Sequence, residues 1–246
     1  KQVYMSEFKF PTEEVDLPSK GLIYPKDHPL SSGKVEIKYM TAKEEDILSN
    51  QSFIQKGTVL EKLLRSVIIS KDINVDDLII GDKNAVLIAT RILGYGKDYK
   101  VTIAGQDEKI DLTELDNREF DTSLITQGIN EFNYTLPSTG VVLTYKILTG
   151  RDEKAIEREI AGLKKVNKES DPSISTRLKF MILSVDGNEE KKFVREYIDN
   201  SFLARDSRAF RSHVSDIQPD IDLKYITESG EEVLVPIGLS FFWPDF

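Results

Sequence analysis

The sequence contains no cysteine. Without thiols, the chain forms no disulfide bond and has neither a thiolate metal site nor a cysteine nucleophile. Histidine is almost as scarce, because His28 and His213 are the only two and lie far apart in the sequence. A zinc site needs three or four nitrogen, sulfur or oxygen ligands, and a nucleophilic triad needs a base beside its serine. Neither set is evident, and no Gly-x-Ser-x-Gly elbow occurs, so we expect no metal site, no catalytic residue and no enzymatic activity.

Long hydrophobic runs and an excess of positive charge are also lacking. No stretch of about 18 apolar residues occurs, which is the length that would span a bilayer, and the first residues lack the basic and then apolar pattern of a secretion signal. The 33 lysines and arginines are outnumbered by 42 aspartates and glutamates, which gives a formal net charge of −9. Binding to nucleic-acid phosphates requires a cationic surface. We therefore expect neither a membrane nor a nucleic acid as partner.

Two segments with glycine and lysine superficially resemble phosphate-binding loops. Residues 81–83 and 94–97 fit neither the eight-residue pattern that ends in Gly-Lys-Ser/Thr nor the pattern Gly-x-Gly-x-x-Gly. We interpret them as the start and the end of a helix, and we expect no bound cofactor. Carboxylates such as Glu44 and Glu189 occur where helices are expected to begin, and the helix dipole stabilises negative charge there. We interpret them as solvated side chains and not as an acid–base pair.

Segments with helical and with strand-like periodicity alternate along the chain. Apolar residues make up 39% of the sequence, which is enough for a hydrophobic core. The pattern predicts an α+β fold with a helical body, a small antiparallel sheet and an inserted helical block. We expect the strand-rich regions to share one sheet, with the second helical region inserted between them. The predicted regions are an extended N-terminal arm (1–38), a helical region (39–98), strand hairpins (99–148), a helical insertion (149–219), and a hairpin with an aromatic C-terminal tail (220–246).

Local capping signals indicate where the helices begin and end. Three threonines precede an acidic residue at the spacing of a capping box, namely Thr41 with Glu44, Thr58 with Glu61, and Thr149 with Asp152. Asp82 is a further candidate N-cap, and Gly94 and Gly96 are candidate helix ends. Residues 173–185 are predicted to form one continuous helix.

The N-terminal arm is expected to be extended. Prolines at positions 11, 18, 25 and 29 prevent a continuous helix. Leu17, Ile23 and Tyr24 are the candidate contact residues of the arm. Such an arm either folds back on its own domain or wraps around a neighbouring chain, and we favour docking on its own domain.

A cationic stripe is predicted on the last helix of the insertion. Arg205, Arg208 and Arg211 recur every three residues, with Asp206 and Asp216 nearby. The stripe either forms local ion pairs, which we favour, or binds a carboxylate surface of a partner.

The aromatic tail is the other candidate site for a partner. It contains Phe241, Phe242, Trp243 and Phe246. Adjacent aromatic residues cannot all face the same side of a strand, so they are either buried on both faces or meet another chain. Aromatic side chains are frequent anchors of interfaces.

At several of these positions the sequence resembles a bacteriophage protein family. The similar segments follow one another over nearly the whole chain and are residues 16–25 (DLPSKGLIYP), 39–48 (YMTAKEEDIL), 56–60 (KGTVL), 81–84 (GDKN), 91–96 (RILGYG), 136–140 (LPSTG) and 241–244 (FFWP). They look like segments of the T4-type bacteriophage baseplate hub assembly proteins. The resemblance implies a protein of contractile-tail baseplates, located in the virion or in the host cytoplasm during assembly. Other baseplate or hub proteins are its implied partners.

One departure from this family concerns metal binding. Family members tend to carry Cys-x-x-Cys knuckles in two hairpin turns, as zinc ribbons do. Here the corresponding turns, residues 103–108 and 226–231, contain no cysteine. The resemblance therefore implies degenerate zinc-ribbon-like hairpins that are held by packing and backbone hydrogen bonds, and metal binding is not carried over.

Three classes of function remain at this point. We expect a non-enzymatic structural or assembly component of a tail baseplate that acts through protein–protein contacts. A generic protein-interaction adaptor unrelated to tails is the alternative. A hydrolase or nucleotide enzyme would need an assembled set of reactive groups, which the sequence does not indicate.

Overall fold

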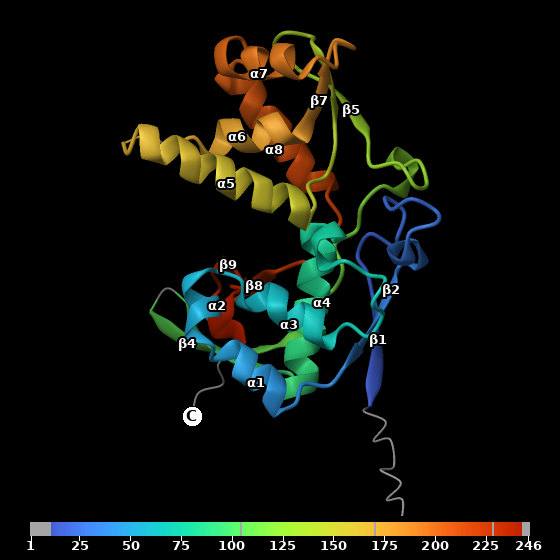
Figure 1. Cartoon of the computed structure of the whole chain (residues 1–246), viewed down its shortest axis with the longest axis vertical. Helices are drawn as coiled ribbons and strands as arrows, with labels where there is room; N and C mark the ends of the chain where they lie inside the picture. Colours follow the sequence, from blue (N-terminus) through green and yellow to red (C-terminus); the bar gives the residue numbers. More distant parts are fainter. Residues whose placement is uncertain (1–10, 104, 170, 228, 243–246) are drawn as a thin grey trace, which may run out of the picture.

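The computed structural model describes residues 11–103, 105–169, 171–227 and 229–242 (Figure 1). Helices and short antiparallel strands alternate, so the fold is α+β, as the sequence predicts. The helices are α1 (Ala42–Leu48), α2 (Gln51–Gln55), α3 (Val59–Val67), α4 (Ile80–Tyr95), α5 (Gly150–Val166), α6 (Ser173–Met181), α7 (Lys191–Asn200) and α8 (Ala204–Ile217). The strands are β1 (Thr12–Asp16), β2 (Lys34–Lys38), β3 (Asp98–Ile103), β4 (Gln106–Asp111), β5 (Phe132–Thr135), β6 (Val142–Tyr145), β7 (Ile182–Val185), β8 (Lys224–Ile226) and β9 (Glu232–Leu234). Short 3-10 turns are η1 (Pro29–Ser32), η2 (Val75–Asp77), η3 (Leu112–Glu114), η4 (Thr122–Leu124) and η5 (Leu239–Phe242).

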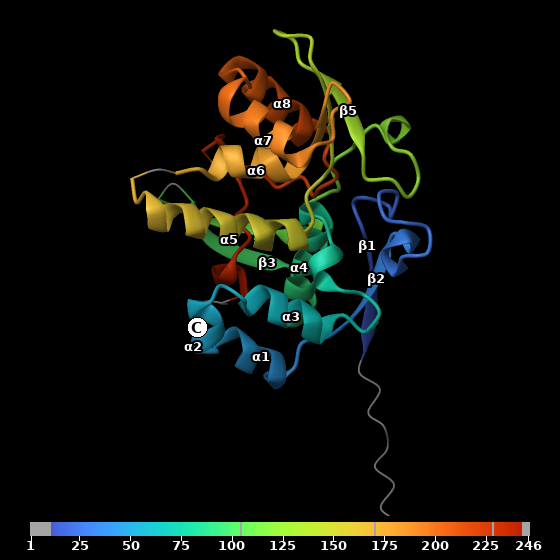
Figure 2. The same cartoon turned by 45° about the horizontal axis from the view of Figure 1, so that its top comes forward.

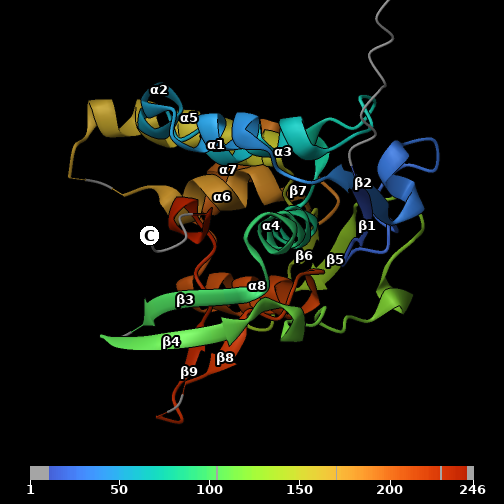
Figure 3. The ribbon, with the colours of Figure 1, turned by 90° about the horizontal axis from the view of Figure 1, so that it is seen from below.

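Helix α4 lies at the centre of the molecule and is seen end-on in Figure 3. Ala85, Val86 and Leu87 are consecutive and all buried, and a helix that is apolar on nearly all sides belongs in a core. In this view α1, α2 and α3 lie on one side of α4, and the β3–β4 and β8–β9 hairpins lie on the other. The helix therefore has contacts with both halves of the chain.

Helices α5–α8 form the upper part of the molecule in Figures 1 and 2. Helix α5 lies between the lower helices and the other three, and the β5–β6–β7 sheet flanks α6–α8. One apolar cluster extends through both parts, from Leu64 of α3 to Phe210 of α8. The two helical regions therefore share a core.

The strands form four separate antiparallel sheets, so the prediction that the strand-rich regions share one sheet was wrong. Sheets β1–β2, β3–β4 and β8–β9 have two strands each, and β5–β6–β7 has three. The β3–β4 and β8–β9 hairpins lie beside each other (Figure 3), and the Tyr225 hydroxyl donates a hydrogen bond to the Glu108 carboxylate at 3.3 Å. Strand periodicity predicts that a segment is extended, but it does not specify which strands pair.

The predicted helix over residues 173–185 is divided into two elements. Helix α6 ends at Met181, and the next four residues form β7, which pairs with β6 through Leu143↔Val185 and Thr144↔Ser184. Ile182 and Val185 are β-branched and suit a strand. The free edge of β6 supplies the pairing, so tertiary structure overrides the helical pattern here.

Two of the three predicted capping boxes are present, at Thr41–Glu44 and Thr149–Asp152. The third is not, because Thr58 makes no capping hydrogen bond and Glu61 forms ion pairs with other side chains. A capping box is a local signal, but its acidic residue is free to bind a stronger partner from elsewhere in the fold.

The predicted ends of α4 are only partly right. The helix begins at Ile80, so Asp82 lies within its first turn and is not the N-cap. Gly94 lies inside the helix, whereas Gly96 ends it with a φ of +85°, a conformation that glycine adopts without strain. Asp82 is buried and binds the arm instead.

Candidate functional site

The N-terminal arm docks on its own chain. The predicted contact residues Leu17, Ile23 and Tyr24 are 1%, 3% and 5% exposed, respectively, and belong to the central apolar cluster. Strands β1 and β2 pair from Thr12↔Lys38 to Asp16↔Lys34, which folds the arm back on itself. For residues 11–38, docking in cis is therefore the alternative that is observed. These apolar side chains are covered and present no free surface.

Asp82 holds the arm against α4. This residue is fully buried, and its carboxylate accepts hydrogen bonds from the Ser19 amide at 2.9 Å, the Ser19 hydroxyl at 2.6 Å and the Tyr24 hydroxyl at 2.6 Å. The Tyr24 hydroxyl in turn accepts from the Ile79 amide at 3.1 Å. Burial raises the pKa of Asp82, although the hydrogen bonds from Ser19 and Tyr24 act in the opposite direction. Burial and the adjacent carboxylate raise the pKa of Tyr24 well above its usual value, so its hydroxyl remains a donor.

Gly81 allows the chain that follows α8 to pass close to α4. A Cβ atom at this position would lie 2.0 Å from the carbonyl oxygen of Pro219. Next to it, the Asn84 amide donates to the Asp220 carboxylate at 3.1 Å. Residues 81–84, which superficially resemble a phosphate loop, are thus a contact point between α4, the arm and the segment after α8.

Arg91 joins the other end of α4 to the C-terminal segment. Its guanidinium donates hydrogen bonds to the carbonyl oxygens of Phe241 at 2.9 Å, Gly96 at 2.8 Å and Asp98 at 3.2 Å. The three acceptors come from η5, from the end of α4 and from the start of β3. One cation therefore satisfies carbonyl groups from three segments.

The described part of the aromatic tail is buried within its own chain. Phe241 and Phe242 are 0% and 1% exposed and lie in η5, not in a strand. The Phe241 ring packs edge-on against Tyr99, with 4.8 Å between the ring centroids. Trp243 and Phe246 lie outside the described residues. Of the tail's candidate interface side chains, the two described ones thus contribute to the core.

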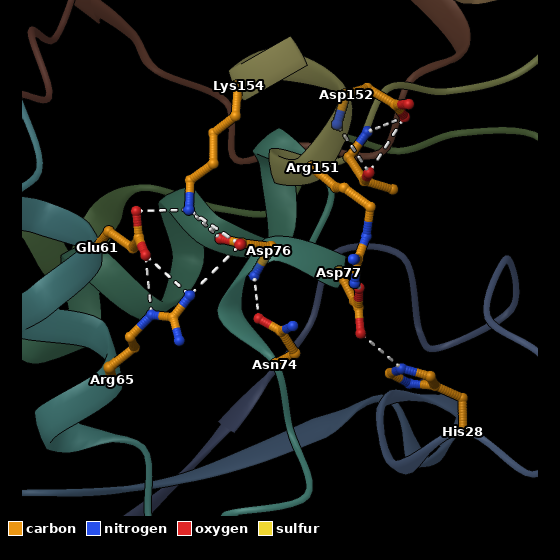
Figure 4. A network of polar contacts seen from close by, with 10 residues as sticks. His28, Glu61, Arg65, Asn74, Asp76, Asp77, Arg151, Asp152 and Lys154 are labelled. Atoms are coloured by element: carbon orange, nitrogen blue, oxygen red, sulfur yellow. Dashed lines mark hydrogen bonds and ion pairs between the residues drawn. The ribbon is translucent and has the colours of Figure 1, made fainter.

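A network of charged side chains ties α5 to α3 and η2 (Figure 4). The Lys154 ammonium lies 2.6 Å from the Glu61 carboxylate and 2.8 Å from that of Asp76. The Arg65 guanidinium contacts the same two carboxylates at 2.8 and 3.3 Å. A cavity of about 150 Å³ borders Glu61 and Lys154. Because the two cations and the two carboxylates neutralise each other, the network holds helices together and leaves no free reactive group.

The same network fastens the arm at Asp77. Its carboxylate accepts a hydrogen bond from Arg151 at 2.6 Å and lies 3.3 Å from Nε2 of His28. Nδ1 of His28 accepts from the Leu30 amide at 3.2 Å, which places the ring proton on Nε2, toward Asp77. Partial burial opposes ionisation of Asp77, but the contacts with Arg151 and His28 lower its pKa. The first of the two histidines therefore stabilises η1 and its contact with η2.

The second histidine lies in a buried aromatic cluster. The Tyr145 hydroxyl is 2.8 Å from Nε2 of His213, and the His213 ring stacks on Tyr134 with 4.2 Å between centroids. Burial lowers the pKa of His213, so the neutral ring can accept a hydrogen bond from the Tyr145 hydroxyl. Across the described ranges, no three His, Asp or Glu side chains are arranged to hold a metal ion.

The larger cavity, about 670 Å³, lies between the β6–β7 strands and helices α6 and α7. Lys146 and Lys179 line it and pair with Asp152 at 2.7 Å and with Asp199 at 2.6 Å. The charges of these two lysines are thus compensated. Apolar side chains such as Phe180 and Ile182 and charged side chains of both signs line the cavity, so it gives no strong preference for a charged ligand.

Arg205, Arg208 and Arg211 are exposed on α8. Within the described residues none of the three forms an ion pair, so the prediction of local pairing was wrong. The nearest acid in the sequence, Asp206, is buried and accepts hydrogen bonds from the Ser138 amide at 2.8 Å and the Thr139 hydroxyl at 2.9 Å. Its carboxylate therefore faces the interior and not the arginines.

Sequence reasoning missed the roles of Asp82, Arg91 and the network around Glu61. Asp82 and Arg91 are charged residues on either side of the apolar run of α4, and both lie in segments that carry the family resemblance. A charge at a core position needs a partner, so these two could have been singled out. The partners themselves lie too far away in the sequence to be identified.

Comparisons with protein-family models, with curated proteins and with solved structures find no match to this chain. No helix among the residues that the structure places combines the length and the apolar character needed to cross a bilayer.

Proposed function

We propose that the protein is a non-enzymatic structural or assembly component of a contractile phage tail baseplate, in the hub or helping to build it. The observation that carries the proposal is the ordered series of segments similar to the T4-type baseplate hub assembly proteins. Distant members of the series meet around α4. Ser19 in residues 16–25 binds Asp82 in residues 81–84, and Arg91 binds the Phe241 carbonyl. The similar segments thus include residues that shape one packed unit in this chain.

The contacts of the polar side chains support a binding role. Lys154 is held by Glu61 and Asp76, and His213 is held by Tyr145. Side chains locked in such contacts keep neighbouring surfaces in a defined shape, which a protein that acts by shape requires.

The partners in this proposal are other baseplate or hub proteins, met in the virion or in the host cytoplasm during assembly. Several exposed apolar side chains are suited to contact them. Ile226 and Leu234, which are 59% and 67% exposed, lie on the same face of the β8–β9 hairpin, and Val166 at the end of α5 is 89% exposed. Exposed apolar side chains that share a face, as Ile226 and Leu234 do, favour association with another protein more than an isolated one does.

Quantitative proteomics of purified mature particles and of tail-assembly intermediates tests the proposal. The copy number of this chain is measured against the major tail protein as an internal reference. A fixed small copy number in mature particles identifies a structural component. Presence in intermediates alone identifies an assembly factor that leaves, and absence from both preparations contradicts the proposal.

A further inference from the structure

The solvent-facing side of α8 carries arginines among small side chains. Arg205, Arg208 and Arg211 are exposed, and the other exposed residues of the helix are alanine or serine, apart from Asp216 near its C-terminal end. A helix rises about 1.5 Å per residue, so the stripe from Arg205 to Arg211 is roughly 9 Å long. We call these three residues the arginine face.

The arginine face gathers three cations, unpaired among the described residues, on one side of a single helix. The sequence has 42 acidic residues and a net charge of −9. Arg65, Arg151 and Arg177 each form an ion pair with a carboxylate of their own chain. Within the described residues, the arginine face has no such partner. Three free guanidinium groups in a row on an acidic protein are therefore available to an external anion.

We propose that the arginine face docks on an acidic patch of another protein, whose aspartate and glutamate carboxylates bind the guanidinium groups. The inference rests on the proposed function, which supplies a protein partner. The planar guanidinium fork binds a carboxylate through two hydrogen bonds, and arginine is enriched at interfaces. Small neighbours such as Ala204 and Ser212 allow a partner backbone to approach α8 closely.

The overall charge favours a protein over a nucleic acid as the occupant. A long polyanion that reached the arginine face would also run along the acidic remainder of the surface, and repulsion acts over a Debye length of about 8 Å. A compact patch of carboxylates needs to touch only the stripe. Charge complementarity therefore points to an acidic protein surface.

Two triple variants of the full chain test this inference. R205Q/R208Q/R211Q neutralises the arginine face, and K43Q/K56Q/K71Q removes as much positive charge at exposed lysines elsewhere that form no ion pair among the described residues. The probe is a fluorescein-labelled deca-glutamate peptide, with binding followed by fluorescence anisotropy at low ionic strength. We expect the arginine variant to bind about tenfold more weakly than the wild type, and the lysine variant to bind within about twofold of it.

A third variant and a second probe complete the experiment. R205K/R208K/R211K keeps the charge but loses the planar fork, and we expect it to bind less well than the wild type and better than the glutamine variant. Equal losses in the arginine and lysine variants, or no wild-type binding at about 1 mM peptide, would overturn the inference. Tighter binding of duplex DNA than of peptide would assign the face to nucleic acid. Particle proteomics is independent of these results, so failure of the docking face and failure of the proposed function are distinguishable.

Discussion

The Tyr24 hydroxyl donates a hydrogen bond to the Asp82 carboxylate at 2.6 Å, although the two residues are 58 positions apart in the sequence. Ser19 gives the same carboxylate two further hydrogen bonds. A buried carboxylate is costly unless hydrogen bonds compensate it. The described part of the arm is therefore a component of the core, and its loss would leave Asp82 without these three donors.

Tyr24→Phe is expected to lower the free energy of unfolding by about 2 to 3 kcal/mol, because it removes a donor from Asp82 and an acceptor from the Ile79 amide. Urea unfolding of the full chain at pH 7 measures the change. Tyr39→Phe is the matched control, since the Tyr39 hydroxyl has only a 3.4 Å contact with the exposed Glu13 carboxylate, and we expect a loss below about 0.5 kcal/mol. Similar losses in both variants would contradict the role of the Asp82 contact.

Gly81→Ala is expected to destabilise the protein by about 1 to 3 kcal/mol, because the new methyl group would meet the Pro219 carbonyl oxygen at 2.0 Å and force the backbone apart. Gly162→Ala provides the opposite control. Gly162 lies within α5 and a Cβ there meets nothing within 4 Å, so alanine should stabilise the helix by about 0.5 to 1 kcal/mol. Thermal melts of both variants measure these opposite shifts, and a stabilised Gly81→Ala variant would refute the close approach.

The parts of the fold that the sequence predicts are those with a local cause. The Thr41–Glu44 and Thr149–Asp152 boxes need only neighbouring residues, and both are present. The predicted region of strand hairpins, residues 99–148, contains two β-rich segments around a Pro/Gly turn, and a hairpin forms there between Phe132–Thr135 and Val142–Tyr145. Each of these signals is complete within about twenty residues of sequence.

The parts that the sequence does not predict depend on distant partners. The local sequence predicts that Asp82 caps a helix. Its actual donor, Ser19, lies 63 positions away in the sequence. The segment Ile182–Val185 has a helical pattern in the sequence, but it forms a strand because it pairs with the edge of β6. The sequence predicted ion pairs for the arginine face because Asp206 lies next to these arginines in the chain. Packing buries Asp206, and the spacing of the residues does not reveal this. In the candidate site, therefore, residue types were predictable, but their burial and partners were not.

Arg91→Met is expected to destabilise the protein by about 3 kcal/mol and to loosen the C-terminal segment first, since three carbonyl groups lose their donor. Hydrogen exchange at the amides of residues 239–242 reports this loosening directly. Arg158→Met is the control, because Arg158 is exposed on α5 and forms no ion pair within the described ranges. If exchange at residues 239–242 were the same in both variants, the Arg91–Phe241 bond would not be what holds η5.

Glu44 is expected to make stability depend on pH. Burial opposes its ionisation, but hydrogen bonds from Lys38 at 2.7 Å, from Ser66 and from Thr41 lower its pKa to about 2. In the unfolded chain this pKa is about 4.3. Because the folded state binds its proton only at lower pH, the stabilisation is complete above about pH 5 and is lost as the pH falls toward 2.

Glu44→Gln should therefore lower the free energy of unfolding by about 2 to 3 kcal/mol at pH 7, and the difference from the wild type should shrink steadily between about pH 5 and pH 2. Chemical denaturation at a series of pH values measures both curves. Glu157→Gln, at an exposed position of α5 with no ion pair among the described residues, should follow the wild-type curve throughout. Parallel curves for wild type and Glu44→Gln would mean that these hydrogen bonds do not lower the pKa of Glu44 in the folded protein. A converging pair would place a pH-sensitive charge where β2, α1 and α3 meet, since Lys38, Glu44 and Ser66 come from these three elements.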